Sequence, residues 1–278
     1  MQDNQRLEQL ILRFQNIEKS LDDVKREIKS VGRTESSDSE SSTKDVVAPS
    51  SHEIVDEEQQ QKQEQTPASC AIVHESNFEK EEPNDTELIK VLKSQVKKLG
   101  FKFAKFSQVP TDYYSRSLEE RRDILQTDSI HQLCKSLILE NSKCVKTDCS
   151  DRNNSKYYCV IVQYSAKFNS KKLTKFVREL NQGKLGKKQF VFSLTDANKA
   201  FELTGYDYNG VSPVPLPSKE HVNIPIVLDK KIVDDHKQFW IGGGTEDWKI
   251  LFNTDEFIRI FNPFVTSITY DGTGDDEE

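Results

Sequence analysis

The sequence lacks the common catalytic motifs, so any chemistry must come from a less usual arrangement of residues. It contains no GxSxG elbow, no GxxxxGK[ST] phosphate loop and no HExxH zinc helix. The histidines, which show no spacing suited to a metal, are His52, His74, His131, His221 and His236. We therefore expect neither a metal nor a cofactor.

One lysine stands at a position where burial of its charged side chain would be energetically unfavourable. Lys135 comes just before the apolar run Leu137-Ile-Leu139, which predicts a buried strand. A lysine that enters such a strand is either a strand-end residue whose ammonium group reaches solvent or a functional cation. The residue pattern alone leaves both interpretations open.

Two glycine-containing segments could bring backbone groups close to a ligand. The segment Asn209-Gly-Val-Ser-Pro213 predicts a tight loop whose backbone N–H groups can act as donors. The second segment, Gly242-Gly-Gly244, lacks the frame of a nucleotide-binding loop, and its simplest interpretation is a strand-ending turn.

Short strands and helices that alternate along the chain must position these residues. Apolar runs and turn signals predict strands at 101–109, 137–139, 157–164, 190–192, 224–228 (with an edge-type proline) and 238–241. Apolar spacing and capping residues predict helices from Thr86 to Gly100, over 170–182 with Asn169 or Ser170 as the cap, over 195–203 and over 255–261. Because some strands follow one another directly, the pattern favours a mixed α+β sheet over a doubly wound parallel one.

Composition divides the chain into four parts. We predict a coiled-coil helix at 1–32, a disordered acidic and polar linker at 33–85, a folded domain at 86–270 and an acidic tail at 271–278. The net charge of −7 hides an opposite balance in the folded part, which has 29 Lys and Arg against 21 Asp and Glu. A polyanionic partner therefore suits this domain.

The N-terminal helix shows the a/d pattern of a coiled coil and ends at Gly32. The apolar positions that recur at steps of three and four are Leu7, Leu10, Phe14, Ile17, Leu21, Val24, Ile28 and Val31. β-Branched residues at d positions disfavour a parallel dimer and favour a trimer, a tetramer or a partner helix. The alternative is an amphipathic helix that packs on its own domain.

A basic face follows the predicted helix over 170–182. Lys172, Lys175 and Arg178 lie opposite its apolar stripe, where they either bind phosphates or form a solvated face. The five cysteines form no CxxC pair, and no apolar run is long enough for a signal peptide or a membrane span. We therefore expect a cytoplasmic protein without a membrane partner.

Several motifs, in this chain order, resemble the YbaK/prolyl-tRNA synthetase-associated domain family. They are Leu133-Cys-Lys-Ser-Leu-Ile-Leu139, Leu203-Thr-Gly-Tyr-Asp-Tyr-Asn-Gly-Val-Ser-Pro213, Pro225-Ile-Val-Leu-Asp229, Trp240-Ile-Gly-Gly-Gly244 and Lys249-Ile-Leu251. The stretches that begin at Tyr113 and Asp151 look like a eukaryotic branch of this family. The resemblance implies a mixed, partly barrel-like β-sheet with flanking helices.

The resemblance also implies an activity and a site. Lys135 matches the essential lysine of the family, and Gly210, Val211, Ser212 and Pro213 match its substrate loop, with Gly243 and Gly244 in the facing turn. Asn209 replaces the first loop glycine, but Asn is the residue that best tolerates a positive φ after glycine. The His-Pro strand of the alanine-specific branch is missing, so alanine specificity does not follow.

The leading hypothesis is a trans-editing deacylase that hydrolyses the ester of mischarged aminoacyl-tRNA, with Cys or Ala on tRNA(Pro) as the implied substrate. An aminoacyl ester is already activated, so the site needs only a held carbonyl, oxyanion donors and a water. Lys172, Lys175 and Arg178 would then bind the acceptor stem of the tRNA. Residues 1–32 would recruit a synthetase or form an oligomer. The alternatives are a non-catalytic tRNA-binding or scaffold subunit of a synthetase assembly and a coiled-coil adaptor.

Overall fold

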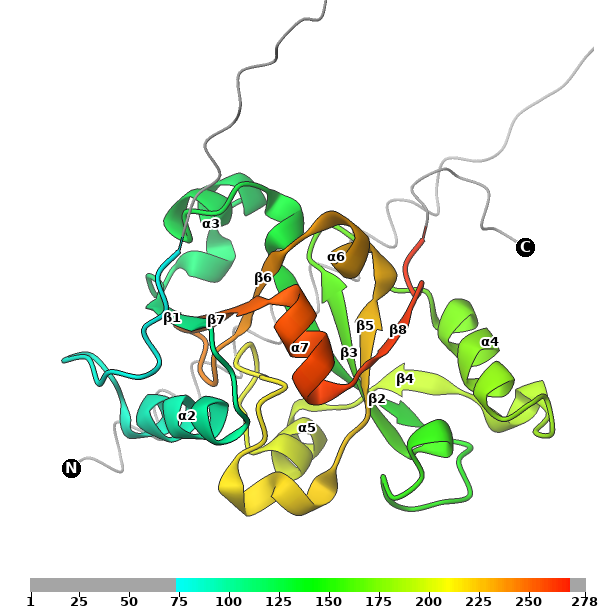
Figure 1. Cartoon of the computed structure of the whole chain (residues 1–278). Helices are drawn as coiled ribbons and strands as arrows, with labels where there is room; N and C mark the ends of the chain where they lie inside the picture. The colour runs from blue at the N-terminus through cyan, green and yellow to red at the C-terminus, as the bar shows by residue number, and fades with distance from the viewer. Residues whose placement is uncertain (1–73, 271–278) are drawn as a thin grey trace, which may run out of the picture. The chain divides into compact units, whose positions relative to one another are not determined.

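The chain folds around two β-sheets that lie side by side (Figure 1). The structure, a computed structural model, describes residues 74–270. A five-stranded sheet has the order β4-β2-β3-β5-β8, and a three-stranded sheet has the order β1-β7-β6. The strands are β1 (Ala104–Gln108), β2 (Cys134–Asn141), β3 (Tyr157–Gln163), β4 (Phe192–Leu194), β5 (Ile226–Asp229), β6 (Gln238–Gly242), β7 (Trp248–Asn253) and β8 (Phe264–Thr266).

The five-stranded sheet is mixed, which confirms the predicted α+β class. β2 pairs antiparallel with β3 and β4, whereas β3–β5 and β5–β8 are parallel pairs. Every residue of β3 is buried, which explains its nearly continuous apolar sequence. A parallel bridge between Leu133 and Trp240 joins the two sheets just before β2 begins. The start of β2 therefore lies at the junction of the sheets.

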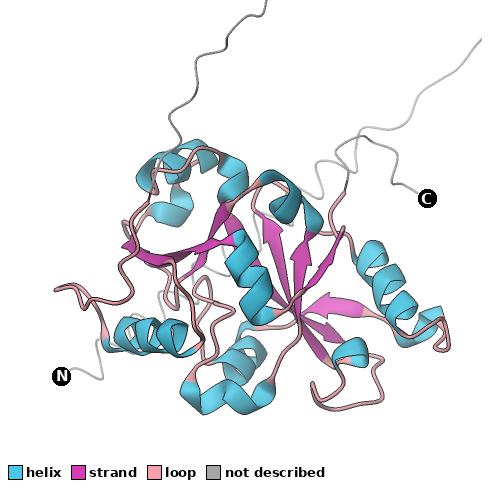
Figure 2. Cartoon of the chain, viewed as in Figure 1, coloured by secondary structure: helices cyan, strands magenta, loops and turns pink. Residues whose placement is uncertain are grey.

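Helices surround the sheets (Figure 2). They are α2 (Glu87–Lys98), α3 (Leu118–Ile124), α4 (Ser170–Leu180), α5 (Ala197–Thr204), α6 (Lys230–Asp235) and α7 (Thr254–Phe261). Two predicted caps are confirmed, because the Thr86 side chain accepts from the Ile89 N–H and the Asn169 side chain accepts from the first N–H groups of α4. The short elements α6 and β8 were not predicted, since their sequences carry too little periodicity.

Each face of the five-stranded sheet has its own hydrophobic core. Ile138, Ile161 and Leu228 belong to the core on one face. Leu139 belongs to the core on the other face, together with residues of β3. The apolar stripe of α4 covers this second face with Leu173 and Val177. Since side chains alternate along a strand, Lys135 lies on the α4 face with Leu137 and Leu139. The basic helix and the candidate lysine therefore share one side of the sheet.

The folded domain begins earlier than composition suggested. Residues 74–85, which we placed in the linker, pack on the domain, and the Phe78 side chain is only 4% exposed. Lys93 Nζ lies 2.7 Å from Asp85 Oδ2 in an ion pair that is almost fully buried. Asn77 donates its N–H to the Ala104 carbonyl at the first residue of β1. A buried aromatic ring, a buried ion pair and backbone hydrogen bonds therefore attach this polar segment to the domain.

The proline of the fifth strand is another difference from the sequence-based expectation. β5 lies inside the sheet, between β3 and β8, so its proline does not mark an edge strand. Pro225 instead stands just before the first residue of β5, and its carbonyl accepts the Cys159 N–H at 2.9 Å. A proline at this position costs no ladder hydrogen bond, because it is the proline carbonyl that takes part.

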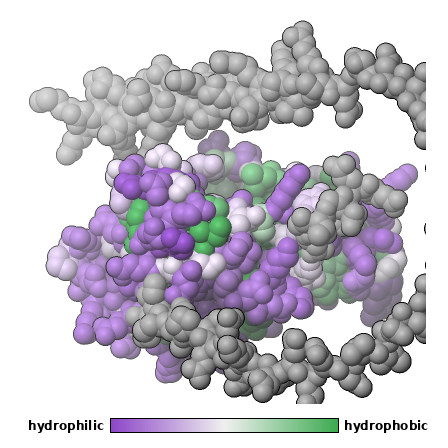
Figure 3. Space-filling model, turned by 90° about the horizontal axis from the view of Figure 1, so that it is seen from above, coloured by the Kyte–Doolittle hydropathy of each residue, from purple (hydrophilic) through white to green (hydrophobic). Residues whose placement is uncertain are grey.

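Several expectations lie outside the described residues. They are the coiled coil at 1–32, most of the linker at 33–85 and the acidic tail at 271–278. None of the helices within 74–270 has the length and apolar character that crossing a membrane requires. The face seen from above is mostly hydrophilic, with hydrophobic areas in small patches (Figure 3).

Candidate functional site

Lys135 is the second residue of β2 and pairs with Val162 of β3. Its side chain is half-buried, and Nζ lies 5.4 Å from the centroid of the Tyr164 ring. Within residues 74–270 the ammonium group has no hydrogen bond and no ion pair. Burial lowers the pKa of Lys135 because the charged form loses its water. A half-buried cation without a counterion can receive an anionic or polarised ligand oxygen.

The loop that contains Asn209 keeps its turn although asparagine replaces glycine. Asn209 has φ +63°, in the left-handed region that asparagine tolerates, as predicted. The turn is closed by the Gly210 N–H, which donates to the Asp207 carbonyl at 3.0 Å. Asn209 Nδ2 also donates to Glu246 Oε1 at 2.9 Å, a contact that glycine could not make.

The two predicted glycine segments meet through their backbones. The Gly244 N–H donates to the Gly210 carbonyl at 2.9 Å. A Cβ atom on Gly210 would lie 2.5 Å from the Gly244 carbonyl oxygen, and one on Gly242 would lie 2.5 Å from the Val211 carbonyl oxygen. Only glycine permits this approach. The Gly243 N–H is also engaged, with the Trp248 carbonyl at 2.9 Å, so we assign Gly243 and Gly244 to support of the loop.

The middle of the loop from Asn209 to Pro213 presents free backbone donors. The N–H groups of Val211 and Ser212 have no acceptor among the described residues. Pro213 has no N–H, and the Ser212 hydroxyl accepts from the Val214 N–H at 3.3 Å. Buried or half-buried N–H groups are nearly always paired, so two consecutive free ones are a candidate oxyanion site.

A tyrosine pair connects Lys135 to this loop. The Tyr114 hydroxyl donates to the Asn209 carbonyl at 2.9 Å, and the Tyr164 hydroxyl lies 3.4 Å from the Tyr114 hydroxyl. Because Lys135 stacks on Tyr164, the four residues form a continuous line from the strand to the loop. Our sequence analysis did not assign either tyrosine to the site.

Arg121 holds the segment that carries Tyr114. Its guanidinium donates to the Tyr113 carbonyl at 3.0 Å and to the Tyr114 carbonyl at 2.6 Å. It also lies 5.3 Å to 5.6 Å from the ring centroids of three tyrosines, including Tyr164. This combination of hydrogen bonds and cation–π contacts fixes the 3-10 turn η1 (Tyr113–Ser115) beside the candidate site.

Lys249 is a second buried lysine in this cluster. Its side chain is 4% exposed, and Nζ donates to the Tyr114 hydroxyl at 3.1 Å and to the Glu246 carbonyl at 2.8 Å. Burial lowers the pKa of Lys249 to about 7, although the nearby carboxylates of Glu246 and Asp247 act in the opposite direction. The sequence held a signal for this residue, since Lys249 interrupts an apolar strand in the same way as Lys135.

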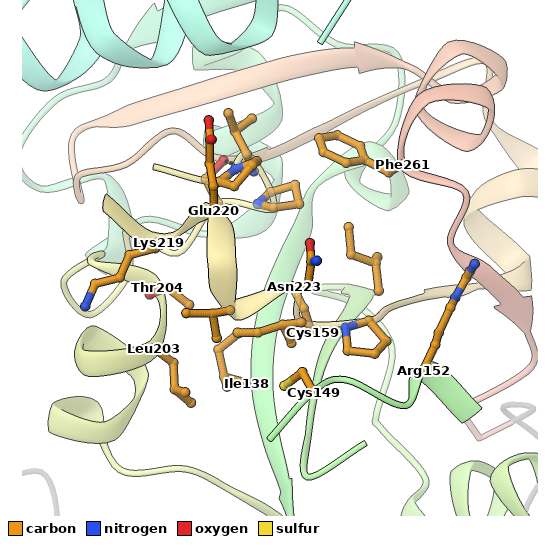
Figure 4. A pocket seen from close by; sticks show the side chains of 18 of the residues that line it. Ile138, Cys149, Arg152, Cys159, Leu203, Thr204, Lys219, Glu220, Asn223 and Phe261 are labelled. Atoms are coloured by element: carbon orange, nitrogen blue, oxygen red, sulfur yellow. Dashed lines mark hydrogen bonds between the residues drawn. The ribbon is translucent and has the colours of Figure 1, made fainter. Parts of the chain in front are cut away.

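One cavity of the described residues is lined in part by the loop but not by Lys135. It has a volume of about 470 Å³, and its lining includes Ser212 and Pro213. Ile138, Cys159 and Leu203 also line it (Figure 4). Ile138 and Lys135 are three residues apart on β2, so their side chains face opposite sides of the sheet. Lys135 therefore does not face this cavity, and we centre the candidate site on the lysine and the free N–H groups.

The three basic residues predicted to bind tRNA differ in their surroundings. Lys172 Nζ donates to the Thr269 carbonyl at 2.9 Å, so this side chain has a structural contact. Lys175 is exposed on α4, and Arg178 is half-buried, with its Nε lacking an acceptor among the described residues. Lys175 is therefore the simplest test of the predicted surface.

Comparison with known proteins relates part of this chain to one family. Residues 125–260 match the family model described as the aminoacyl-tRNA editing domain. This match confirms the resemblance found in the motifs of the chain. Among curated proteins no sequence gives a significant match.

Solved structures show the same fold. A candidate trans-editing enzyme for prolyl-tRNA synthetase superposes with a TM-score of 0.51 at 18% identity, over 66% of this chain and 98% of that chain. A structure from a study of computational epitope-backbone grafting onto scaffold proteins gives the same TM-score, identity and coverage. At this identity the likeness establishes the fold alone.

Proposed function

We propose that this protein is a trans-acting aminoacyl-tRNA deacylase with Lys135 and the Asn209 to Pro213 loop as its site. The observation that carries the proposal is the pair of free N–H groups at Val211 and Ser212, in a loop tied through Tyr114 and Tyr164 to a lysine without a counterion. The aminoacyl-tRNA editing family model supports it, because editing of a charged tRNA is ester hydrolysis.

The chemistry needs no side-chain nucleophile. In the proposed reaction a water oxygen attacks the carbonyl carbon of the aminoacyl ester, and the N–H groups of Val211 and Ser212 stabilise the oxyanion that develops. The bond from the carbonyl carbon to the ribose oxygen then breaks, and the ribose oxygen takes up a proton. The products are the free amino acid and deacylated tRNA. Lys135 binds the terminal phosphate or polarises the ester.

We propose a small misacylated amino acid, Cys or Ala on tRNA(Pro), as the substrate. The motifs of the chain support this class, and one similar structure is described as a candidate trans-editing enzyme for prolyl-tRNA synthetase. The rings of Tyr114 and Tyr164 link Lys135 to the loop and would be close to the bound amino acid.

The proposed partners follow from the same reaction. The exposed basic residues of α4, above all Lys175, would contact the tRNA backbone, and residues 1–32 would bind a synthetase or other copies of the chain. Four free cysteines in the described part, Cys134, Cys144, Cys149 and Cys159, support a reducing compartment such as the cytosol.

Hydrolysis of a panel of mischarged tRNAs by the full-length chain tests the proposal. We expect release of the amino acid from Cys-tRNA(Pro) or Ala-tRNA(Pro) and none from correctly charged Pro-tRNA(Pro). Tight binding of the panel without turnover of any member would overturn deacylation and favour the alternative of a non-catalytic tRNA-binding or scaffold subunit.

A further inference from the structure

Tyr208 is the most exposed Phe, Tyr or Trp side chain in residues 74–270, with 77% of its surface accessible. It has no hydrogen bond or ring contact within the described residues. An exposed aromatic ring of this kind gains free energy when a flat apolar group covers it. Tyr208 comes one residue before Asn209 and is therefore adjacent to the candidate loop.

The backbone around Tyr208 is held on both sides. The Asp207 carbonyl accepts the Gly210 N–H at 3.0 Å, and the Asn209 carbonyl accepts the Tyr114 hydroxyl at 2.9 Å. Asn209 itself is fixed at φ +63° and bonded to Glu246. A ring on such a turn is preorganised, because the backbone that carries it loses little further freedom when a ligand binds.

The distance from Tyr208 to the free N–H groups is limited by the chain itself. Tyr208 directly precedes Asn209, whose carbonyl is bonded to the Tyr114 hydroxyl at 2.9 Å. Val211 is the third residue after Tyr208, so their Cα atoms lie at most about 11 Å apart. That distance is comparable with the span of one nucleoside.

We infer that Tyr208 forms a stacking site for the adenine base of the tRNA 3′ end. This inference rests on the proposed function, because in an aminoacyl-tRNA the ester carbonyl is bonded to the ribose of the terminal adenosine. When the carbonyl oxygen lies at the N–H groups of Val211 and Ser212, the attached adenine must lie within one nucleoside of them. Aromatic rings bind unpaired RNA bases by stacking, and Tyr208 is the exposed ring at this distance.

A double-mutant cycle on the full-length chain tests the inference without relying on hydrolysis. One change is Tyr208→Ala and the other is removal of the terminal adenosine, with a tRNA(Pro) transcript that ends in CCA and the same transcript ending in CC. We expect Tyr208→Ala to weaken binding of the CCA transcript roughly tenfold to a hundredfold and to leave binding of the CC transcript unchanged. Tyr208→Phe should retain wild-type affinity. Phe201→Ala, at an exposed aromatic on α5, is the matched control.

The outcomes separate this inference from the proposed function. Equal effects of Tyr208→Ala on both transcripts would overturn the stacking site, even if hydrolysis is intact. Selective loss on the CCA transcript, without hydrolysis of any mischarged tRNA, would support the stacking site and overturn deacylation. A wild-type protein that binds neither transcript would overturn both.

Discussion

The hydroxyl group of Tyr114 donates a hydrogen bond to the backbone carbonyl of Asn209 across 2.9 Å, although 95 residues separate the two in the chain. The same hydroxyl accepts from Lys249 Nζ at 3.1 Å and lies 3.4 Å from the Tyr164 hydroxyl. Burial and the neighbouring Tyr164 raise the pKa of Tyr114, so it stays a donor at physiological pH. One phenol therefore fixes the position of the loop relative to Lys135.

Removal of this hydroxyl should loosen the loop. We expect Tyr114→Phe to lower the free energy of unfolding by about 1 to 3 kcal/mol, because the Asn209 carbonyl and one Lys249 N–H lose their partner. In steady-state kinetics, the fold decrease in kcat for deacylation should exceed the fold increase in KM. Tyr164→Phe is the control, since it removes only the 3.4 Å contact. Denaturant titration and steady-state kinetics measure both effects, and an inert Tyr114→Phe would contradict the role given to this residue.

Loss of the candidate cation should affect chemistry before folding. We expect Lys135→Ala to cut deacylation roughly a hundredfold or more, the scale of one preorganised polar group in an active site. The melting curve should be unchanged or shifted upward, because a half-buried ammonium without a partner is costly. Lys143→Ala, at an exposed lysine of the loop after β2, should have little effect on either measurement. Full activity of Lys135→Ala would show that the site is wrongly assigned.

The buried Lys249 should make stability depend on pH. Its pKa is about 7 in the folded chain against 10.5 when exposed, so between these values the unfolded chain binds a proton that the folded chain does not. Stability therefore rises with pH in this window and is independent of this group below about pH 7. Relative to Lys249→Met, wild type should gain about 1.4 kcal/mol per pH unit between pH 7 and pH 10.

Urea titrations of both proteins at several pH values measure this difference. Parallel pH profiles for wild type and Lys249→Met would mean that the ammonium form persists, stabilised by the carbonyl of Glu246 and the Tyr114 hydroxyl.

Because the backbone at Asn209 is left-handed, replacement by glycine and replacement by alanine should affect stability differently. Asn209→Gly restores the residue common in the family, and we expect the unfolding free energy and the deacylation rate to stay near wild type. Asn209→Ala should cost about 1 to 2 kcal/mol, because an alanine at φ +63° is strained. Both variants lose the contact with Glu246, so their difference isolates the backbone effect. Equal stabilities in thermal unfolding would argue against a rigid turn.

Charge reversal at two lysines of α4 should have different effects on tRNA binding and on stability. We expect Lys175→Glu to weaken tRNA binding and to reduce the slope of log K against log salt by roughly 0.7 to 0.9 for one phosphate contact. Lys172→Glu should in addition lower the melting temperature, because it breaks the bond to the Thr269 carbonyl. Lys102→Glu, at an exposed lysine before β1, is the control. If Lys175→Glu and the control bind tRNA alike, the tRNA lies on another face.

The sequence alone predicted the elements that depend on short-range interactions. Helix α4 and its Asn169 cap, helix α2 and its Thr86 cap, and the buried strand β3 all follow from apolar spacing and from side chains that bond to nearby N–H groups. The tolerance of Asn209 for a positive φ was also predictable, because it is a property of the residue itself. The resemblance to the editing family was visible for the same reason, since each motif is a short run of consecutive residues.

Tertiary structure decided how these pieces meet. Lys249 and Tyr114 are 135 residues apart, and their contact exists because β7 pairs with β1 and β6 beside the turn that Arg121 holds. The close approach of Gly210 to Gly244 and the buried pair of Asp85 and Lys93 likewise depend on packing between distant segments. Periodicity reports which face of an element is buried but not which element covers it. The partners of Lys135 and of the loop could therefore be read only from the folded chain.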